Sequence, residues 1–257
     1  MIASFLFGPF RLLWGSAVRI AIHQPNFLPW LGYFYKVARA DLFVLLDDVQ
    51  FTKEGFIHRN WVKTCDGKRW FGVPVYTKGA LHQEIRQVRI CRDEPWQRKL
   101  VGTLMQHYSK ASYYAEHAGA LREIVGRDYA LLVDLNIKLL EYVCGVLGIS
   151  TPMVRASELR GVAGTSTARL ISICQSVGAT EYLSGSGGKK YQDEEAFRAA
   201  GIELIYRDFV HPAYPQLLGP FESKLSVIDL LFNAGPESRD VLLDRQSPDS
   251  RPPILSG

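Results

Sequence analysis

The sequence predicts a Rossmann-like α/β fold: a mainly parallel sheet with helices on both faces, interrupted in the middle by a β-hairpin and a helical insertion. Three observations support this prediction. Apolar β-rich segments alternate with helical segments near the start of the chain and again over residues 153–233, which favours right-handed parallel crossovers. Glycine follows several of the helical segments, as C-terminal caps often do. The chain has 257 residues and is 47% hydrophobic, so it can bury a sizeable core.

The predicted elements follow in order along the chain. Apolar runs bounded by turn residues predict strands at residues 18–23, 42–47, 70–76, 85–91, 153–156, 181–184 and 203–206. Apolar residues at helical spacing predict helices at residues 31–39, 95–108, 111–126, 129–147, 167–178, 193–200 and 224–233. The segment 70–91 is expected to form the hairpin. The aromatic residues of the first helix, Tyr33 to Tyr35, indicate core packing.

The chain is expected to divide into three parts. Residues 18–236 form the α/β domain, with the insertion at about 64–150. Residues 237–257 mix proline, serine and charge, which is typical of a disordered and dispensable tail. Residues 1–17 are apolar but interrupted by Arg11, and they fall short of the roughly 20 residues that span a bilayer. They are either a short surface arm or the product of a start codon upstream of the true one, and the second interpretation is favoured.

Composition limits the classes of function. The 30 basic and 26 acidic residues give a net charge of +4 that is spread along the chain, so nucleic acid is not an expected partner. The cysteines at positions 65, 91, 144 and 174 form no CxxC pair and have no close histidine, so they are interpreted as reduced thiols of a cytoplasmic protein, and they predict no zinc site. The sequence lacks GxSxG, HExxH and a GxGxxG directly after a strand, which disfavours common hydrolases, zinc proteases and dehydrogenases.

Polar side chains gather where predicted strands end, and ligands of parallel sheets bind at these carboxyl ends. The first strand leads directly into His23, Gln24 and Asn26. The second ends in Asp47 and Asp48, of which Asp48 is favoured as a general base or magnesium ligand. The polar residues that follow it suit a phosphate or carboxylate: Gln50, Lys53, Arg59, Asn60 and Lys63. The alternatives are a capped turn for the first group and a solvated turn or loop for the second.

Two later segments complete the candidate site. YLSGSGGKKY leads from a strand through Ser184 and Gly185 to Lys189, and glycine turns that enter a helix favour an anion. It is not a Walker A loop, and an ordinary glycine turn is the alternative. HPAYPQ contributes His211 as a candidate proton carrier, or as a loop histidine bonded to backbone. The remaining candidates of these segments are Tyr191, Tyr214 and Gln216.

These motifs carry a resemblance to a known family. The segments are HQPNFLPWLGYFYK, DDVQFTKEGFIHRNWVK, EYLSGSGGKKY, GIELIY, HPAYPQ and LSVIDLLFNAG, and over about residues 19–235 they resemble the WbqC-like family. The resemblance implies a role in bacterial O-antigen and other surface polysaccharides, in which glycine or another amino-acid or acyl group is transferred to a sugar. It carries over these residues: His23, Gln24, Pro25, Asp48, Gln50, Lys53, Arg59, Asn60, Lys63, Ser184, Gly185, Tyr191, His211, Tyr214 and Gln216.

Three hypotheses follow. The first is a cytoplasmic transferase with a small-molecule donor and a sugar-type acceptor, in which His23 or Asp48 deprotonates the acceptor and basic side chains hold phosphate or carboxylate. The second is a ligase or nucleotidyltransferase that uses ATP with magnesium. It rests on a fainter likeness to HIGH-type nucleotidyltransferases, although no HxGH is present and only TSTAR at 165–169 is similar to their second phosphate motif. The third is a non-catalytic scaffold of a polysaccharide assembly complex.

Overall fold

The computed structural model describes residues 17–77 and 82–243. Within these ranges the chain forms a five-stranded, fully parallel sheet in the order β5-β2-β1-β6-β7. The strands are β1 (Arg19–His23), β2 (Leu42–Leu45), β5 (Met153–Arg155), β6 (Glu181–Gly185) and β7 (Glu203–Arg207). The predicted α/β fold with a mainly parallel sheet is confirmed.

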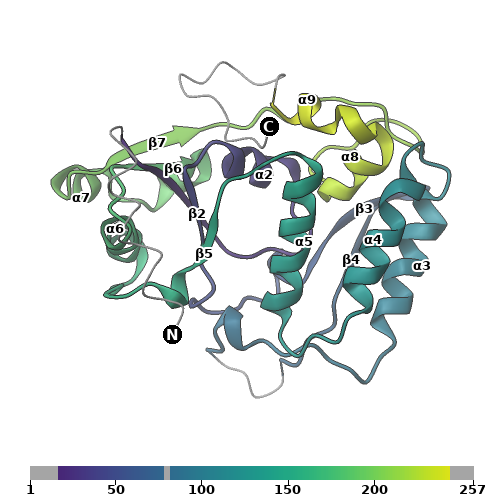
Figure 1. The fold of residues 1–257 in the computed structure, drawn as a ribbon, viewed down its shortest axis with the longest axis horizontal. Helices are drawn as coiled ribbons and strands as arrows, with labels where there is room; N and C mark the ends of the chain where they lie inside the picture. The colour runs from purple at the N-terminus through teal and green to yellow at the C-terminus, as the bar shows by residue number, and fades with distance from the viewer. Residues whose placement is uncertain (1–16, 78–81, 244–257) are drawn as a thin grey trace.

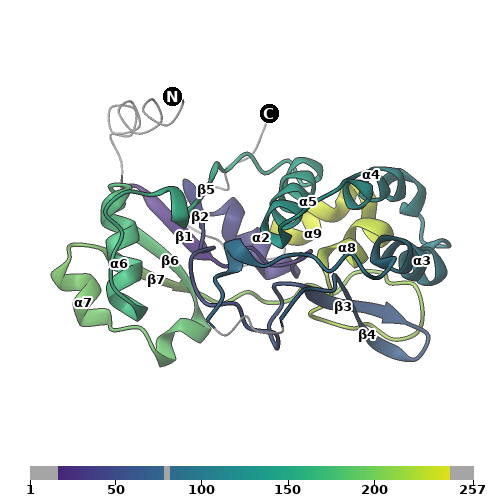
Figure 2. The same cartoon turned by 90° about the horizontal axis from the view of Figure 1, so that it is seen from below.

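Helices cover both faces of the sheet. In Figures 1 and 2, α6 and α7 lie on one face, and α2 and α5 lie on the other. Alternate residues of β1 follow this division: Ile20 and Ile22 pack with α6 and α7, whereas Ala21 packs with α2 and α5. The helices are α2 (Leu31–Ala38), α3 (Trp96–Tyr108), α4 (Tyr114–Gly126), α5 (Leu132–Val146), α6 (Ser166–Ser176), α7 (Glu194–Ala199), α8 (Val227–Ala234) and α9 (Ser238–Leu243).

Glycine conformation explains why two of these helices end where they do. Gly178 follows α6 and Gly201 follows α7, each with a positive φ that glycine adopts at little cost. Each turn leads within a few residues into the next parallel strand. In the described part of the chain, no helix has both the length and the apolar character needed to cross a bilayer.

The strand order reverses beside β1. From this strand the chain moves outward on one side to β2 and β5, then returns through α6 to place β6 and β7 on the other side. In open parallel sheets the reversal leaves a crevice at the carboxyl ends of the two strands that flank it, here β1 and β6. The fold therefore defines where a ligand site is expected before any side chain is considered.

The hairpin lies elsewhere than predicted. It consists of β3 (Arg59–Thr64) and β4 (Gly67–Gly72), which pair antiparallel and form a separate sheet. The predicted strand at 70–76 overlaps β4, but the strand predicted at 85–91 is wrong, because Ile85–Gln87 is a 3-10 turn. The strand β3 was missed because its polar residues indicated a loop. In the structure several of them are buried with specific partners, which lets a polar segment pair as a strand.

The end of the chain also corrects a prediction. Residues 238–243, expected to begin a disordered tail, form α9 instead. Its Val241, Leu242 and Leu243 are buried in the large core that includes α2 and α8, so burial of apolar side chains stabilises the helix. Residues 244–257, the rest of the predicted tail, and residues 1–16 of the predicted N-terminal extension lie outside the described residues.

A buried carboxylate joins the hairpin, the helices and the loop before α8. Asp229 on α8 has no exposed surface and accepts hydrogen bonds from the hydroxyl of Tyr108 at 2.9 Å, the hydroxyl of Tyr214 at 2.9 Å and the amide of Gln216 at 2.7 Å. The Gln216 oxygen accepts in turn from the ammonium of Lys63, whose exposed fraction is 2%. We call these five residues the Asp229 network.

Removal of the central carboxylate tests this assignment. Asp229→Ala leaves two buried hydroxyls and one amide without their acceptor, so the free energy of unfolding should fall by about 3–5 kcal/mol. Urea denaturation followed by circular dichroism measures the difference. Asp240→Ala, which removes an exposed carboxylate from α9, is the control and should change the value by less than about 0.5 kcal/mol. Equal stability of the two variants would contradict a central role for Asp229.

Candidate functional site

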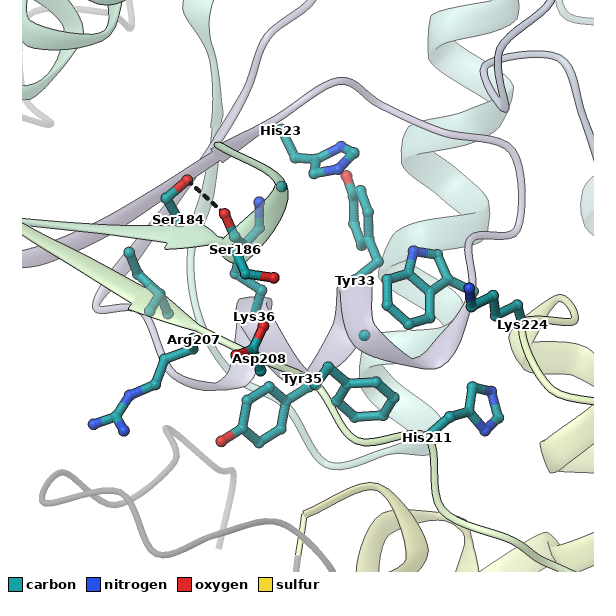
Figure 3. A pocket seen from close by; sticks show the side chains of 16 residues that line it. His23, Tyr33, Tyr35, Lys36, Ser184, Ser186, Arg207, Asp208, His211 and Lys224 are labelled. Carbon is teal, nitrogen blue, oxygen red and sulfur yellow. Dashed lines mark hydrogen bonds between the residues drawn. The ribbon is translucent and has the colours of Figure 1, made fainter. Parts of the chain in front are cut away.

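A cavity of about 350 Å³ lies at the carboxyl ends of β1, β6 and β7, beside α2. Figure 3 shows the side chains that surround it. Its volume is within the range of small-molecule sites. The lining residues are His23, Trp30, Gly32, Tyr33, Tyr35, Lys36, Leu183, Ser184, Gly185, Ser186, Gly187, Arg207, Asp208, Phe209, His211 and Lys224.

The cavity opens where the central strands separate. The pairing of β1 with β6 ends at Ala21 and Leu183, whereas β1 stays paired with β2 as far as His23, and β6 stays paired with β7 as far as Gly185. We call this divergence the β1–β6 split. It releases the carbonyl of Ile22 from the sheet ladder, and this oxygen accepts a hydrogen bond from the Lys36 ammonium at 3.1 Å. The side chain of Lys36 thus extends from α2 into the β1–β6 split.

His23 is held in one protonation state and one tautomer. Burial, together with the nearby Lys36 cation, lowers the pKa of His23 to about 3, so the imidazole is neutral near pH 7. Its Nδ1 lies 3.1 Å from the carbonyl oxygen of Gln24, which can only accept. The Nδ1 therefore carries the proton, and Nε2 is a hydrogen-bond acceptor. The ring also packs edge-on against Tyr33, with centroids 4.8 Å apart.

A glycine-rich turn forms the wall that follows β6. A side chain at Gly188 would place a Cβ 2.6 Å from both the Ser184 hydroxyl and the Gln192 side-chain oxygen, so only glycine fits there. A Cβ at Gly185 or Gly187 would meet nothing within 4 Å. The turn therefore lines the cavity with backbone at these two positions, which lets a ligand approach the main chain closely.

Aromatic rings form the opposite wall. The Trp30 indole packs edge-on against Phe209 with centroids 5.4 Å apart, and Tyr35 packs against the same ring at 5.4 Å. Trp30 lies over the first turn of α2, where a Cβ at Gly32 would be 2.4 Å from the indole. The glycine thus makes room for the indole at the cavity. Such apolar faces suit a flat or ring-shaped ligand.

The charge of the cavity is mainly positive. Lys36, Arg207 and Lys224 line it, and among the described lining residues Asp208 is the one carboxylate. His211 is neutral near pH 7, because burial, and to a lesser extent Lys68 and Lys224, lower its pKa. Three basic side chains around one carboxylate favour an anionic ligand such as a phosphate or carboxylate. The described residues contain no group of three His, Cys, Asp or Glu side chains arranged to hold a metal ion.

Four of the predicted site residues meet at this cavity: His23, Ser184, Gly185 and His211. Gln24 and Asn26 follow β1 but do not line it. The backbone oxygen of Gln24 accepts a hydrogen bond from Nδ1 of His23 and another from the Tyr33 hydroxyl at 3.2 Å.

The two aspartates at the end of β2 have other partners. Asp48 forms an ion pair with Arg169 of α6, outside the cavity. Asp47 has no exposed surface and accepts hydrogen bonds from Arg155 at 2.7 Å and from Ser157. These hydrogen bonds join the ends of β2 and β5. Because a guanidinium already lies against Asp48, we do not assign it to a magnesium ion.

The other candidates lie outside the cavity. Lys63, Tyr214 and Gln216 belong to the Asp229 network. Asn60 is buried and donates to the backbone oxygens of Phe27 and Leu28. Arg59 pairs with Glu54 at 3.2 Å and covers the Trp70 ring. The exposed candidates are Gln50, Lys53, Lys189 and Tyr191.

Several lining residues were missed by sequence reasoning, and Lys36 is the most informative of them. A signal was present: Lys36 is the one charged residue of the otherwise apolar helix segment LGYFYKVA, so its ammonium needed a polar destination. Trp30, Phe209 and Lys224 carried no comparable signal. Their side chains reach the cavity through loops whose course depends on tertiary packing.

The model of the WbqC-like protein family matches residues 24–241. The uncharacterized protein Rv1507c of Mycobacterium tuberculosis (strain ATCC 25618 / H37Rv) is 39% identical over 226 residues, which cover 87% of this chain and 97% of that protein. No solved structure matches the chain.

The contact between Gly32 and Trp30 gives a test of the cavity wall. Gly32→Ala should displace the indole, since the added Cβ would overlap it, while alanine favours a helix by about 1 kcal/mol over glycine and so retains α2. Tryptophan fluorescence should shift in Gly32→Ala relative to wild type. The same substitution in a Trp30→Phe background is the control and should produce no shift. An unchanged spectrum in the single variant would show that the indole does not lie over Gly32.

Proposed function

This chain belongs to the WbqC-like protein family, and on that basis we propose that it is a transferase that adds an amino-acid or acyl group to a sugar or sugar nucleotide. We further propose that the reaction serves bacterial surface polysaccharide synthesis in the cytoplasm and takes place in the cavity at the β1–β6 split. The family resemblance suggests the pathway, and the geometry of the cavity suggests the site.

The observation that carries the proposal is the neutral His23 within a cationic cavity. Its Nε2 is ready to accept a hydrogen bond from an acceptor hydroxyl or amine, because Gln24 fixes the tautomer. Arg207 and Lys224 supply positive charge for a phosphate or carboxylate on donor or acceptor. Trp30, among the aromatic lining residues, offers a flat apolar face to a sugar ring or base.

The arrangement also suits transfer because it positions reactants. A preformed hydrogen-bond acceptor and fixed charges need little rearrangement when a ligand binds, so the binding energy can orient the donor and the acceptor for reaction. Ser184 has an exposed fraction of 4%, and its hydroxyl donates to the Gly185 backbone oxygen at 3.2 Å. We therefore assign Ser184 a positioning role in the glycine turn and no covalent step.

A first test concerns His23. His23→Ala removes the acceptor at Nε2, so turnover with an acyl donor and a sugar acceptor should fall by about 10²–10⁴-fold. The melting temperature should stay close to that of the wild type. His58→Ala is the matched control, because burial also keeps His58 neutral, with a pKa lowered to about 4, but this residue does not line the cavity. Wild-type rates in His23→Ala would remove His23 from the mechanism.

A second test identifies the ligand class. A ligand that binds the native state alone raises the melting temperature, so we expect a rise with nucleotide sugars or acyl-coenzyme A. Lys224→Gln should reduce the rise, because it removes a cavity cation, whereas Lys53→Gln, exposed and outside the cavity, should not. A rise with Mg-ATP that Asp48→Asn abolishes would favour the ligase hypothesis instead. No rise with any of these ligands would count against the transferase and favour the scaffold.

A further inference from the structure

Lys36 is the residue of α2 whose position packing does not explain. The other seven residues of this helix are buried, and α2 belongs to the large core. A lysine here turns its ammonium into the β1–β6 split, where it donates to the Ile22 oxygen at 3.1 Å. Within residues 17–77 and 82–243 this is the one hydrogen bond of an ammonium that has three donors. Two donors are therefore left for a ligand in the cavity.

The surroundings of Lys36 disfavour its charge. Burial lowers the pKa of Lys36 to about 7, and no ion pair to a carboxylate accompanies it in the described residues. The titratable groups that line the cavity with it are His23 from β1, Tyr33 and Tyr35 from α2, Arg207 and Asp208 from the end of β7, and His211 and Lys224 from the segment before α8. Two of them are cations, one is a carboxylate, and the two imidazoles are neutral near pH 7. Near neutral pH a substantial fraction of Lys36 is therefore a free amine, which can accept a proton.

We propose that Lys36 is the catalytic base of this site, the group that takes the proton from the acceptor as transfer occurs. The inference deepens the proposed function and rests on it. It also assigns different roles to two residues of the cavity. His23 orients the acceptor by accepting a hydrogen bond from a second hydroxyl or N–H of the sugar, and the amine of Lys36 receives the proton that leaves the reacting group.

The proposed transfer step requires an acyl donor that is already activated. An acceptor hydroxyl or neutral amine of the sugar loses a proton to the Lys36 amine, and its oxygen or nitrogen bonds to the carbonyl carbon of an activated acyl donor, a thioester or an acyl phosphate. The bond from that carbon to sulfur or to phosphate oxygen breaks. The leaving thiolate or phosphate carries away the electron pair, and the proton passes from Lys36 to the leaving group or to water.

The comparison with His23 explains why the lysine is the better base. A general base works best when its pKa lies near the working pH. Burial and the neighbouring cation hold the pKa of the His23 imidazole at about 3, so it binds a proton weakly. The amine of Lys36 titrates close to neutrality and lines the same cavity.

The first experiment measures the proton affinity of Lys36 without any substrate. The full-length protein is treated with trace acetic anhydride between pH 5 and pH 11, and the acetylation of each lysine is followed by mass spectrometry. Lys36 should show a midpoint near pH 7. The exposed Lys138 of α5 is the internal control, and the reference for comparison is the pKa of about 10.4 that lysine has in free peptides. A midpoint near pH 10 for Lys36 would overturn the inference whatever the protein transfers.

The second experiment separates proton transfer from binding. Lys36→Arg retains the positive charge but cannot give up a proton, so kcat should fall by about 10²–10⁴-fold with a small change in KM. In the wild type, kcat/KM should rise with pH to a plateau above about pH 7. Lys36→Met should lose turnover, whereas Lys138→Met should match the wild type. Melting temperatures confirm that each variant is folded.

The outcomes distinguish the two proposals. Full turnover in Lys36→Arg would overturn the role of Lys36 and leave the transferase intact. A wild-type protein that transfers nothing to any acceptor, with the Lys36 midpoint still near pH 7, would refute the proposed function and with it the catalytic role. A low midpoint together with loss of kcat in Lys36→Arg would support both.

Discussion

The central constraint of this structure is that β1 must pair with two neighbours that the chain reaches in opposite directions. At the amino end the neighbours are held together, because the buried Arg19 of β1 pairs with Glu181 of β6 at 2.7 Å. At the carboxyl end β1 and β6 part after Ala21 and Leu183. The same reversal of strand order thus gives a tightly joined end that stabilises the sheet and an open end that exposes main-chain polar groups. The cavity, and the need for a donor to the Ile22 oxygen, both follow from it.

The Asp229 network determines what lies over that open end. The segment from 208 to 226 carries Phe209, His211 and Lys224 to the cavity, yet it contains little regular secondary structure in the described chain. Its course is set by Tyr214 and Gln216, which bond to the buried carboxylate, and by the buried Lys63, which donates to the Pro220 oxygen at 2.6 Å. A charge on α8 therefore positions residues of the site without touching a ligand. Because buried polar groups are costly when unpaired, this arrangement also holds the segment in one course.

The sequence allowed the sheet and most helices to be predicted, because their signals are local: apolar runs of strand length, helical spacing and terminal glycines. It also located three of the strand ends that form the cavity. It could not separate ligand-binding polar residues from buried polar residues with protein partners, so Lys63, Tyr214 and Gln216 were grouped with His23 and Ser184. That distinction depends on contacts between residues more than a hundred positions apart, such as Lys63 with Gln216. The polar strand β3 was missed for the same reason.

Lys36 shows the opposite failure: it is the one charged residue of an apolar helix segment, yet it was not predicted as a site residue, because an isolated lysine on a helix is ordinarily solvated. Here its folded-state pKa of about 7 lies below the value of about 10.4 expected for the unfolded chain, so the folded state disfavours the charged form. The sign of the linkage follows: the penalty is fully present below pH 7 and is relieved as pH rises toward 10, where the unfolded chain still binds the proton and the folded chain does not. Lys36 therefore costs stability at the pH where its amine becomes reactive. Packing alone would be served better by an apolar side chain, and the hydrogen bond to Ile22 could be made by a shorter neutral donor. The combination of a stability cost with a place in the cavity is what a site that needs a neutral amine requires.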